Sequence, residues 1–398
     1  MILITRMGTS FLVAAVILGL MLSLDPYNAA FGISGFPIVK FLPYIFSSFA
    51  LVLLGISVRF LKVSLSFCLV SVFLALALAG SLFPLIMYNA LLEETFLGRL
   101  LGGSAFFAAY LLSGKPIELN LFYRFLAPAL YFFTFVAFLF LLVYNFGFAY
   151  QGLDQIYQVK VSLFMSAVVF AYLNEKRLPI KYFVISLGMI TTFLVSKSTA
   201  YLAIVCTLSY MTWVGLTGVN IKSLSYRHKL LLGGGVFFGL IAILFLAFFG
   251  VYYVIQGRLN DRGFDVRQTA ISSRILEFFD SPFLGSAFTS SPLIDFGPLH
   301  IPSHTDLLDL LAAGGTVTIL MFYSPLLVSV WRSVSKAGVR LDMSNYPQYV
   351  SFNILIFFVV MAVNPVLFLP GVSILFWVSI GLMLGQNAAI NNQRSMIC

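Results

Sequence analysis

Basic and hydroxyl-bearing residues between positions 266 and 306 are of the types needed for chemistry on a phosphate-activated substrate. Arg267 and Arg274 stand seven residues apart in VRQTAISSRILEFFD (266–280), so a helix would place them on one face. Guanidinium groups bind phosphate oxygens through paired hydrogen bonds. His304 follows in SHTDLLDLL, and a neutral imidazole can accept a proton from a hydroxyl group. Together these residues suit transfer from a phosphate-activated donor to an alcohol.

The start of the following apolar run supports this chemistry. Ser303 and Asp306 form an S-x-x-D pattern, which predicts a capped helix start with His304 in the first turn. Free N–H groups at a helix start favour a bound phosphate and disfavour a charged imidazole, so we expect a neutral His304 near pH 7. We expect Asp306 and Asp309 to cap this helix. No D-x-D or H-E-x-x-H pattern occurs, so no metal and no cofactor are predicted.

Lys197 is a further candidate for binding an anion. It stands in Ser196-Lys197-Ser198, the short break between two apolar runs. A cation flanked by hydroxyl groups at membrane depth is a functional hypothesis by default. The alternative is a lysine that extends its ammonium group to the membrane surface.

The arginines and the histidine also have structural alternatives. His304 could hydrogen-bond a helix end without taking part in a reaction. Arg267 and Arg274 could form ordinary ion pairs on a solvated helix, with Asp265, Glu277 or Asp280 as partners. For an arginine pair considered alone, this interpretation is favoured.

The composition determines which elements must position these residues. Of 398 residues, 61% are hydrophobic and only 9% are charged, and the mean hydropathy is +1.02. Soluble domains carry about 25% charged residues, so this chain could not cover a soluble surface with polar groups. A cytosolic enzyme, a disordered protein and a nucleic-acid-binding module are excluded. The sequence predicts an all-α integral membrane protein that forms a single polytopic domain over residues 1–398.

Apolar runs of helix length predict about twelve transmembrane helices. These runs lie near residues 8–24, 41–58, 65–88, 97–113, 125–148, 157–173, 180–196, 199–218, 230–254, 307–331, 348–367 and 370–387.

The distribution of basic residues predicts the orientation of these helices. Fifteen of the 23 Lys and Arg residues fall on the side of the N-terminus and eight on the other side. Because cytoplasmic loops are rich in Lys and Arg, both termini are expected in the cytoplasm. The connection 255–306 lies on the outer side, yet it carries four Arg and two of the three His. The same segment also carries much of the acid, and binding an anion is the simplest explanation for four Arg on that side.

Together these features resemble the family of bacterial O-antigen polymerases and O-antigen ligases. The resemblance rests on Arg274 and Gly285, an R-x10-G pair within SSRILEFFDSPFLGSAF, and on the following SHTDLLDLLAAGG. The plan of twelve spans with one long loop before the tenth is also similar. The resemblance implies the glycosyltransferase C-type membrane fold, with 255–306 as a periplasmic catalytic loop between spans 9 and 10. Lys197 occupies the place where the family usually has Arg.

The family implies a metal-independent, inverting glycosyltransferase of the bacterial inner membrane that serves lipopolysaccharide biosynthesis. Its donor would be an undecaprenyl-diphosphate-linked oligosaccharide. The catalytic residues would be His304 and Arg274, and the diphosphate would be bound by Arg274, Arg267 and Lys197. An acceptor glycolipid is implied as a second substrate, with a flippase and a chain-length regulator as protein partners. No nucleic-acid partner is expected.

Three functions remain open at this point. A polymerase would transfer the glycan to the sugar hydroxyl of another lipid-linked repeat unit, and the acidic HTDLLDLL favours this function. A ligase would transfer it to lipid A-core. A twelve-span transporter or lipid-linked oligosaccharide flippase would also explain the span count and the intramembrane Lys residues. Against a transporter, the chain shows no related halves and concentrates Arg and His in one long outer loop.

The predicted orientation can be tested by chemical labelling. A cysteine introduced at Ser290 should react with a membrane-impermeant reagent in intact spheroplasts, because residues 256–304 are predicted to be periplasmic. Protection of this cysteine until the membrane is permeabilised would contradict the predicted topology.

Overall fold

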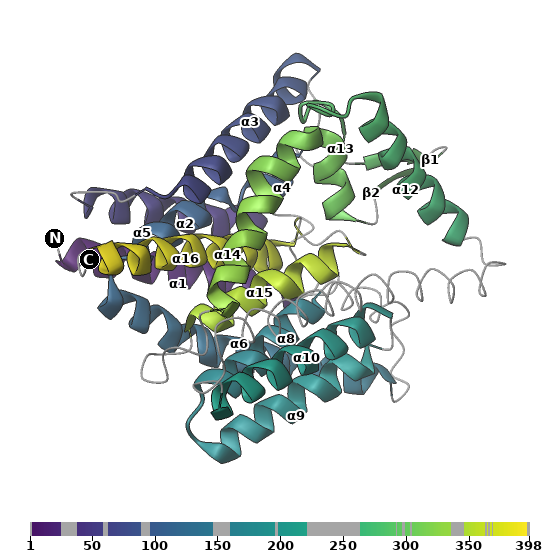
Figure 1. Ribbon diagram of the computed structural model, residues 1–398. Coiled ribbons are helices and arrows are strands. Elements are labelled where there is room, and N and C mark those ends of the chain that lie inside the picture. Colours follow the sequence, from purple (N-terminus) through teal and green to yellow (C-terminus); the bar gives the residue numbers. More distant parts are fainter. Residues whose placement is uncertain are drawn as a thin grey trace.

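The computed structural model describes residues 2–24, 38–58, 63–88, 96–145, 160–195, 198–220, 263–291, 293–296, 299–302, 305–335, 346–362, 364, 367 and 369–395. Within these ranges the chain is almost entirely helical, with one short two-stranded hairpin (Figure 1). Five described helical segments are long and apolar enough to cross a membrane: Ile2–Leu24, Leu65–Met87, Pro116–Val143, Asp306–Ser333 and Pro370–Ala388. The architecture is therefore that of a helical membrane protein.

The elements follow one another along the chain with these bounds. The first half contains α1 (Ile2–Leu24), α2 (Ile38–Ile56), α3 (Leu65–Met87), α4 (Leu97–Leu100), α5 (Gly103–Ser113), α6 (Pro116–Asn145), α8 (Val161–Asn174), α9 (Leu178–Leu194) and α10 (Ser198–Asn220). The second half contains α12 (Gly263–Asp280), β1 (Leu293–Phe296), β2 (Leu299–Pro302), α13 (Asp306–Thr318), η4 (Ile319–Tyr323), α14 (Ser324–Ser335), α15 (Tyr346–Met361) and α16 (Pro370–Ser395).

Every predicted apolar run except one coincides with described helices. The exception, 230–254, lies outside the described residues. The run 97–113 is not the single helix that was predicted, because α4 ends at Leu100 and α5 begins at Gly103. A Cβ atom at Gly102, between them, would lie 2.1 Å from the indole ring of Trp377. The interruption between α4 and α5 thus lies where the backbone passes directly against the fully buried Trp377. The total number of spans and the glycosyltransferase class of the fold stay predictions.

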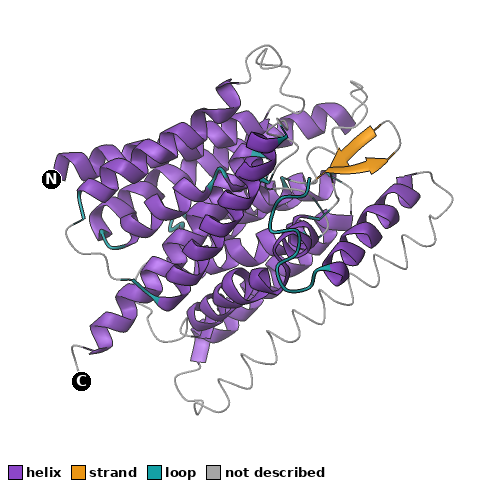
Figure 2. Ribbon diagram, turned by 90° about the horizontal axis from the view of Figure 1, so that it is seen from above, coloured by secondary structure: helices purple, strands orange, loops and turns teal. Residues whose placement is uncertain are grey.

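The helices form two groups that meet where α6 packs against α1 and α5 and where α15 lies between them. One group contains α1, α2, α5 and α16, and the other contains α6, α8, α9 and α10, while α15 contacts α8, α10 and α16. Because lipid cannot satisfy backbone N–H and C=O groups, apolar segments of this kind satisfy them as helices. In both views the two chain termini lie at the end of the bundle opposite α12 and the hairpin (Figures 1 and 2).

Small residues allow α16 to approach α5 closely. A Cβ atom at Gly381 would lie 2.2 Å from the carbonyl oxygen of Phe106, and one at Gly385 would lie 1.8 Å from Ser113 Oγ. Helix pairs in membranes associate through such close backbone approaches. The contact fixes the position of Trp377 on α16, and through it the turn that precedes α5.

Polar contacts occur at both ends of the bundle. At each end they join segments that the Lys/Arg distribution predicted to lie on the same side of the membrane. At the end near the termini, Lys115 Nζ donates to Ser57 Oγ at 2.5 Å and to Thr5 Oγ1 at 3.1 Å. Burial lowers the pKa of Lys115, against the opposing effect of the Glu118 charge. At the opposite end, which we call the distal end, Asn364 Nδ2 donates to Thr199 Oγ1 at 3.0 Å. The two sets agree with the predicted alternation of loops, without showing which side is cytoplasmic.

The span that begins with α13 is broken near its middle. Gly315 has φ +55° and ψ −146°, which is not helical, and the π-helical turn η4 follows. The turn formed by residues 281–291 docks against this break. Backbone hydrogen bonds replace the lost helical ones: Ser286 N–H to Ala312 O (3.2 Å), Phe288 N–H to Ala313 O (3.1 Å) and Thr316 N–H to Pro282 O (2.8 Å).

Gly285, the glycine of the R-x10-G pair, lies at the centre of this contact. Its φ is +59°, and a Cβ atom there would lie 2.2 Å from the carbonyl oxygen of Ala312. Only glycine combines this backbone conformation with so close an approach. The spacing from Arg274 to Gly285 therefore has a structural basis, since it spans the end of α12 and the turn that fits into the break in α13.

Substitution of Gly315 tests whether the break is required. Gly315→Ala should lower the melting temperature of the purified protein, because a side chain at positive φ costs about 1–3 kcal/mol, and the new methyl group would lie 2.6 Å from the Phe283 carbonyl oxygen. Gly55→Ala in α2 is the matched control, since nothing lies within 4 Å of its Cβ position. Equal melting temperatures for the two variants would contradict this interpretation of the break.

Candidate functional site

Arg274 lies where α12 meets the first turns of α13. Its side chain is 5% exposed. The Nε–H group donates to Asp309 Oδ1 at 2.9 Å, Nη1 donates to Glu277 Oε2 at 2.5 Å, and Nη2 donates to the carbonyl oxygen of Ser291 at 2.8 Å. Each of the three guanidinium nitrogens thus has a partner. The predicted helix over 266–280 is confirmed, and so is its end at Ser281-Pro282.

Asp309 links Arg274 to a second buried arginine. Arg99, on α4, is 4% exposed and donates from Nη1 to Asp309 Oδ2. The same nitrogen lies 3.0 Å from Asp306 Oδ1, and Asp306 Oδ2 accepts the backbone N–H of Leu367 at 2.8 Å. We call Arg99, Arg274, Glu277, Asp306 and Asp309 the distal ion cluster.

All members of the cluster except Glu277 are held away from water. Asp306 and Asp309 are 0% exposed, and two guanidinium groups face three carboxylates, a formal charge of −1 when all are ionised. Removing one partner of a buried ion pair costs about 3–5 kcal/mol, because the other charge stays buried without compensation. Ionisable residues at membrane depth are functional candidates by default. The distal ion cluster is therefore the leading candidate site in the described part of the chain.

The start of α13 differs from the prediction. The helix begins at Asp306, and its N-cap is Thr305, whose Oγ1 accepts the N–H of Leu308 at 3.3 Å. The predicted Ser303 cap is therefore wrong, since Asp306 directs its carboxylate to Arg99 and Leu367. Asp309 was expected to cap the helix, but its carboxylate instead pairs with Arg99 and Arg274. His304 comes before the N-cap, so its predicted place in the first helical turn is also wrong.

The predicted site residues are described to different extents. Arg274 is fully described, and its ion pair with Glu277 is the structural alternative raised by the sequence. Arg267 lies on α12, but its side chain is not described. Lys197 and His304 lie outside the described residues. The roles assigned to these four residues stay predictions.

Sequence reasoning missed Arg99 and Asp309 as members of the site. Arg99 precedes Asp309 by 210 residues, so no local pattern connects them. One signal was present, because Asp306 and Asp309 are three residues apart and a helix places both carboxylates on one face. Two carboxylates on one face of an apolar helix require a buried cation, and that requirement pointed to an arginine in another span.

The turn after α12 leads into an unpredicted hairpin. Strands β1 and β2 pair antiparallel, with Leu293 opposite Pro302 and Asp295 opposite His300. The sequence suggested only a stretch rich in Pro and Ser there. The hairpin connects the turn that docks on α13 with the residues just before α13.

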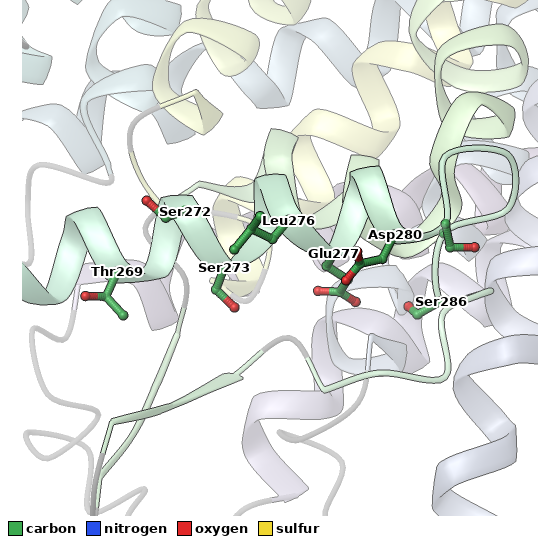
Figure 3. Close-up of a pocket in the computed structure, with 9 residues that line it drawn as sticks. Thr269, Ser272, Ser273, Leu276, Glu277, Asp280 and Ser286 are labelled. Atoms are coloured by element: carbon green, nitrogen blue, oxygen red, sulfur yellow. The ribbon is translucent and has the colours of Figure 1, made fainter.

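A cavity of about 1000 Å³ lies along α12, beside the distal ion cluster (Figure 3). Glu277 belongs to both, since it pairs with Arg274 and also lines the cavity. The other described lining residues are mostly hydroxyl-bearing: Thr269, Ser272, Ser273, Leu276, Asp280, Ser281, Gly285 and Ser286. Within the described ranges, no three His, Cys, Asp or Glu side chains converge in a way that could hold a metal ion.

Comparison of the chain with protein-family models, with curated proteins and with solved structures gives no match. The resemblance to O-antigen polymerases and ligases therefore rests on the residues quoted from the sequence alone.

The distal ion cluster should contribute strongly to stability. Asp309→Asn should lower the free energy of unfolding by about 3–5 kcal/mol, because Arg99 and Arg274 would both lose a charged partner in a buried place. The control is Arg177→Ala, which removes the ion pair with Glu175. Arg177 is 74% exposed, and exposed ion pairs contribute less than about 1 kcal/mol to stability. Thermal unfolding in detergent measures the stability of both variants. A smaller loss of stability for Asp309→Asn than for Arg177→Ala would contradict the view that Asp309 compensates two buried arginines.

Proposed function

We propose that the chain is a bacterial inner-membrane glycosyltransferase that polymerises a surface polysaccharide of the O-antigen type. It transfers an undecaprenyl-diphosphate-linked glycan to the sugar hydroxyl of another lipid-linked repeat unit on the periplasmic side. The observation that supports this most directly is the distal ion cluster. It attaches the loop segment α12, which carries Arg267 and Arg274, to the start of α13, two residues after His304 in the chain.

The geometry of Arg274 suggests how a diphosphate could bind. Asp309 is 0% exposed, whereas Glu277 is 24% exposed, so Glu277 is the partner that a ligand reaches first. A diphosphate oxygen could replace the Glu277 carboxylate at Nη1 while Asp309 continues to hold Nε. One anion would then substitute for another, and the buried guanidinium would stay compensated.

The chemical step follows from the same arrangement. Arg274, Arg267 and Lys197 stabilise the diphosphate as it leaves the anomeric carbon, because the negative charge develops on its oxygens. His304 accepts the proton of the attacking acceptor hydroxyl as the new C–O bond forms. A single displacement inverts the anomeric centre. No metal takes part in this scheme.

The proposed reaction is tested with purified protein and a synthetic undecaprenyl-diphosphate-linked repeat unit, with polymer resolved on a gel. Arg274→Ala should abolish polymer formation, and His304→Asn should slow it by about 10²–10⁴-fold, as expected for loss of a general base. Lys197→Arg should be tolerated and Lys197→Ala should not. His300→Ala is the control and should leave the rate unchanged.

Glu277→Gln separates ligand binding from a purely structural role of Arg274. If Glu277 is exchanged for the diphosphate, its neutralisation should leave the maximal rate intact and lower the KM for the donor. A rise in KM together with a loss of thermal stability as large as that predicted for Asp309→Asn would assign Arg274 a structural role. Transfer solely to lipid A-core would identify a ligase, and no consumption of donor by the wild-type protein would favour the transporter.

A further inference from the structure

The cavity along α12 is a second feature of the distal end, adjacent to the distal ion cluster. We propose that this cavity is a binding subsite for uncharged sugar rings, which would be those of the lipid-linked glycan. The proposal rests on the proposed function for the origin of the glycan. The binding chemistry itself follows from the residues that line the cavity.

The lining residues recur with helical spacing. Thr269, Ser273 and Glu277 are four residues apart on α12, so their side chains follow one face of the helix. Figure 3 shows Thr269, Ser273 and Glu277 directed to the same side of α12, with Ser286 of the following turn near Asp280. The cavity is therefore bounded by a helix face and by the turn that docks on α13.

These groups match the hydrogen-bonding pattern of a sugar. A hydroxyl side chain both donates and accepts, and an ionised carboxylate accepts at two oxygens, so each can pair with sugar hydroxyl groups. Hydrogen bonds to a carboxylate are about twice as strong as those between neutral groups. Leu276 adds an apolar surface against which the C–H face of a sugar ring can pack.

The charge of the cavity defines which sugars it accepts. Its described lining includes the carboxylates of Glu277 and Asp280 and no basic side chain. These two carboxylates disfavour a further carboxylate beside them, such as that of a uronic acid. The diphosphate and the glycan would thus bind on opposite sides of Glu277, the diphosphate against Arg274 and the sugar rings in the cavity.

The size and position of the cavity suit an oligosaccharide. Small-molecule sites commonly measure about 300–1,000 Å³, and this cavity of about 1000 Å³ is at the upper end.

The subsite is tested by binding, without a lipid donor and without turnover. Purified protein in detergent is applied to an array of neutral, amino-sugar and uronic-acid oligosaccharides. The wild type should bind neutral members and not uronic-acid members. Asp280→Asn should weaken that binding at least about tenfold, the loss expected for a hydrogen bond to a charged group. Ser273→Tyr should also weaken it, because the larger side chain would occupy part of the cavity. Both residues are exposed, so neither variant should impair folding.

Phe279→Ser is the matched control, because Phe279 is 68% exposed on the same helix and does not line the cavity. Binding of this variant should equal that of the wild type. The proposal would be overturned if the wild type bound no member of the array or preferred uronic acids. It would also be overturned if Asp280→Asn and Ser273→Tyr left binding unchanged. Polymer formation by a protein that fails these binding tests would leave the proposed function standing and reject the subsite alone.

Discussion

The need to compensate buried charge governs the distal end of this protein. Asp306 and Asp309 are carried into the bundle by an apolar helix and have no access to water. Each must meet a cation, since an isolated carboxylate in such surroundings would be far more costly than the fold can tolerate. Arg99 and Arg274 supply that charge from segments remote in sequence. One carboxylate, Asp309, thereby holds together α4, α12 and α13.

A second attachment acts on the backbone of the same helix. The break at Gly315 releases carbonyl and amide groups, and residues 282–288 supply their hydrogen-bond partners. Ion pairs near the start of α13 and backbone bonds at its break therefore fix α12 and the turn at two points. Groups placed on elements fixed in this way can be held to the tolerance that a reacting site needs. The distal ion cluster and the cavity lie on these fixed elements, so their side chains are held in place.

The sequence was informative where its signal is local. Apolar runs predicted the described helices, and the end of α12 followed from Ser281-Pro282, because hydropathy and proline act on adjacent residues. The pairing of Arg99 with Asp309 joins residues 210 positions apart and could not be read locally. The N-cap was misplaced because Asp306 is drawn into tertiary contacts. Strands of four residues, such as β1, are too short for alternation to be recognised.

Arg274 shows why a residue can be both structural and ligand-binding without conflict. A buried arginine that binds an anionic substrate needs another anion beside it when the substrate is absent. Glu277, one helical turn along α12, provides that anion. Exchange of Glu277 for a diphosphate oxygen keeps an anion beside Arg274, so binding need not cover the cost of exposing a bare guanidinium. Asp309, which is inaccessible, remains as the fixed partner and keeps the fork oriented. The sequence offered the Arg274–Glu277 ion pair as an alternative to phosphate binding. In this scheme that ion pair is the ligand-free state of the phosphate-binding site.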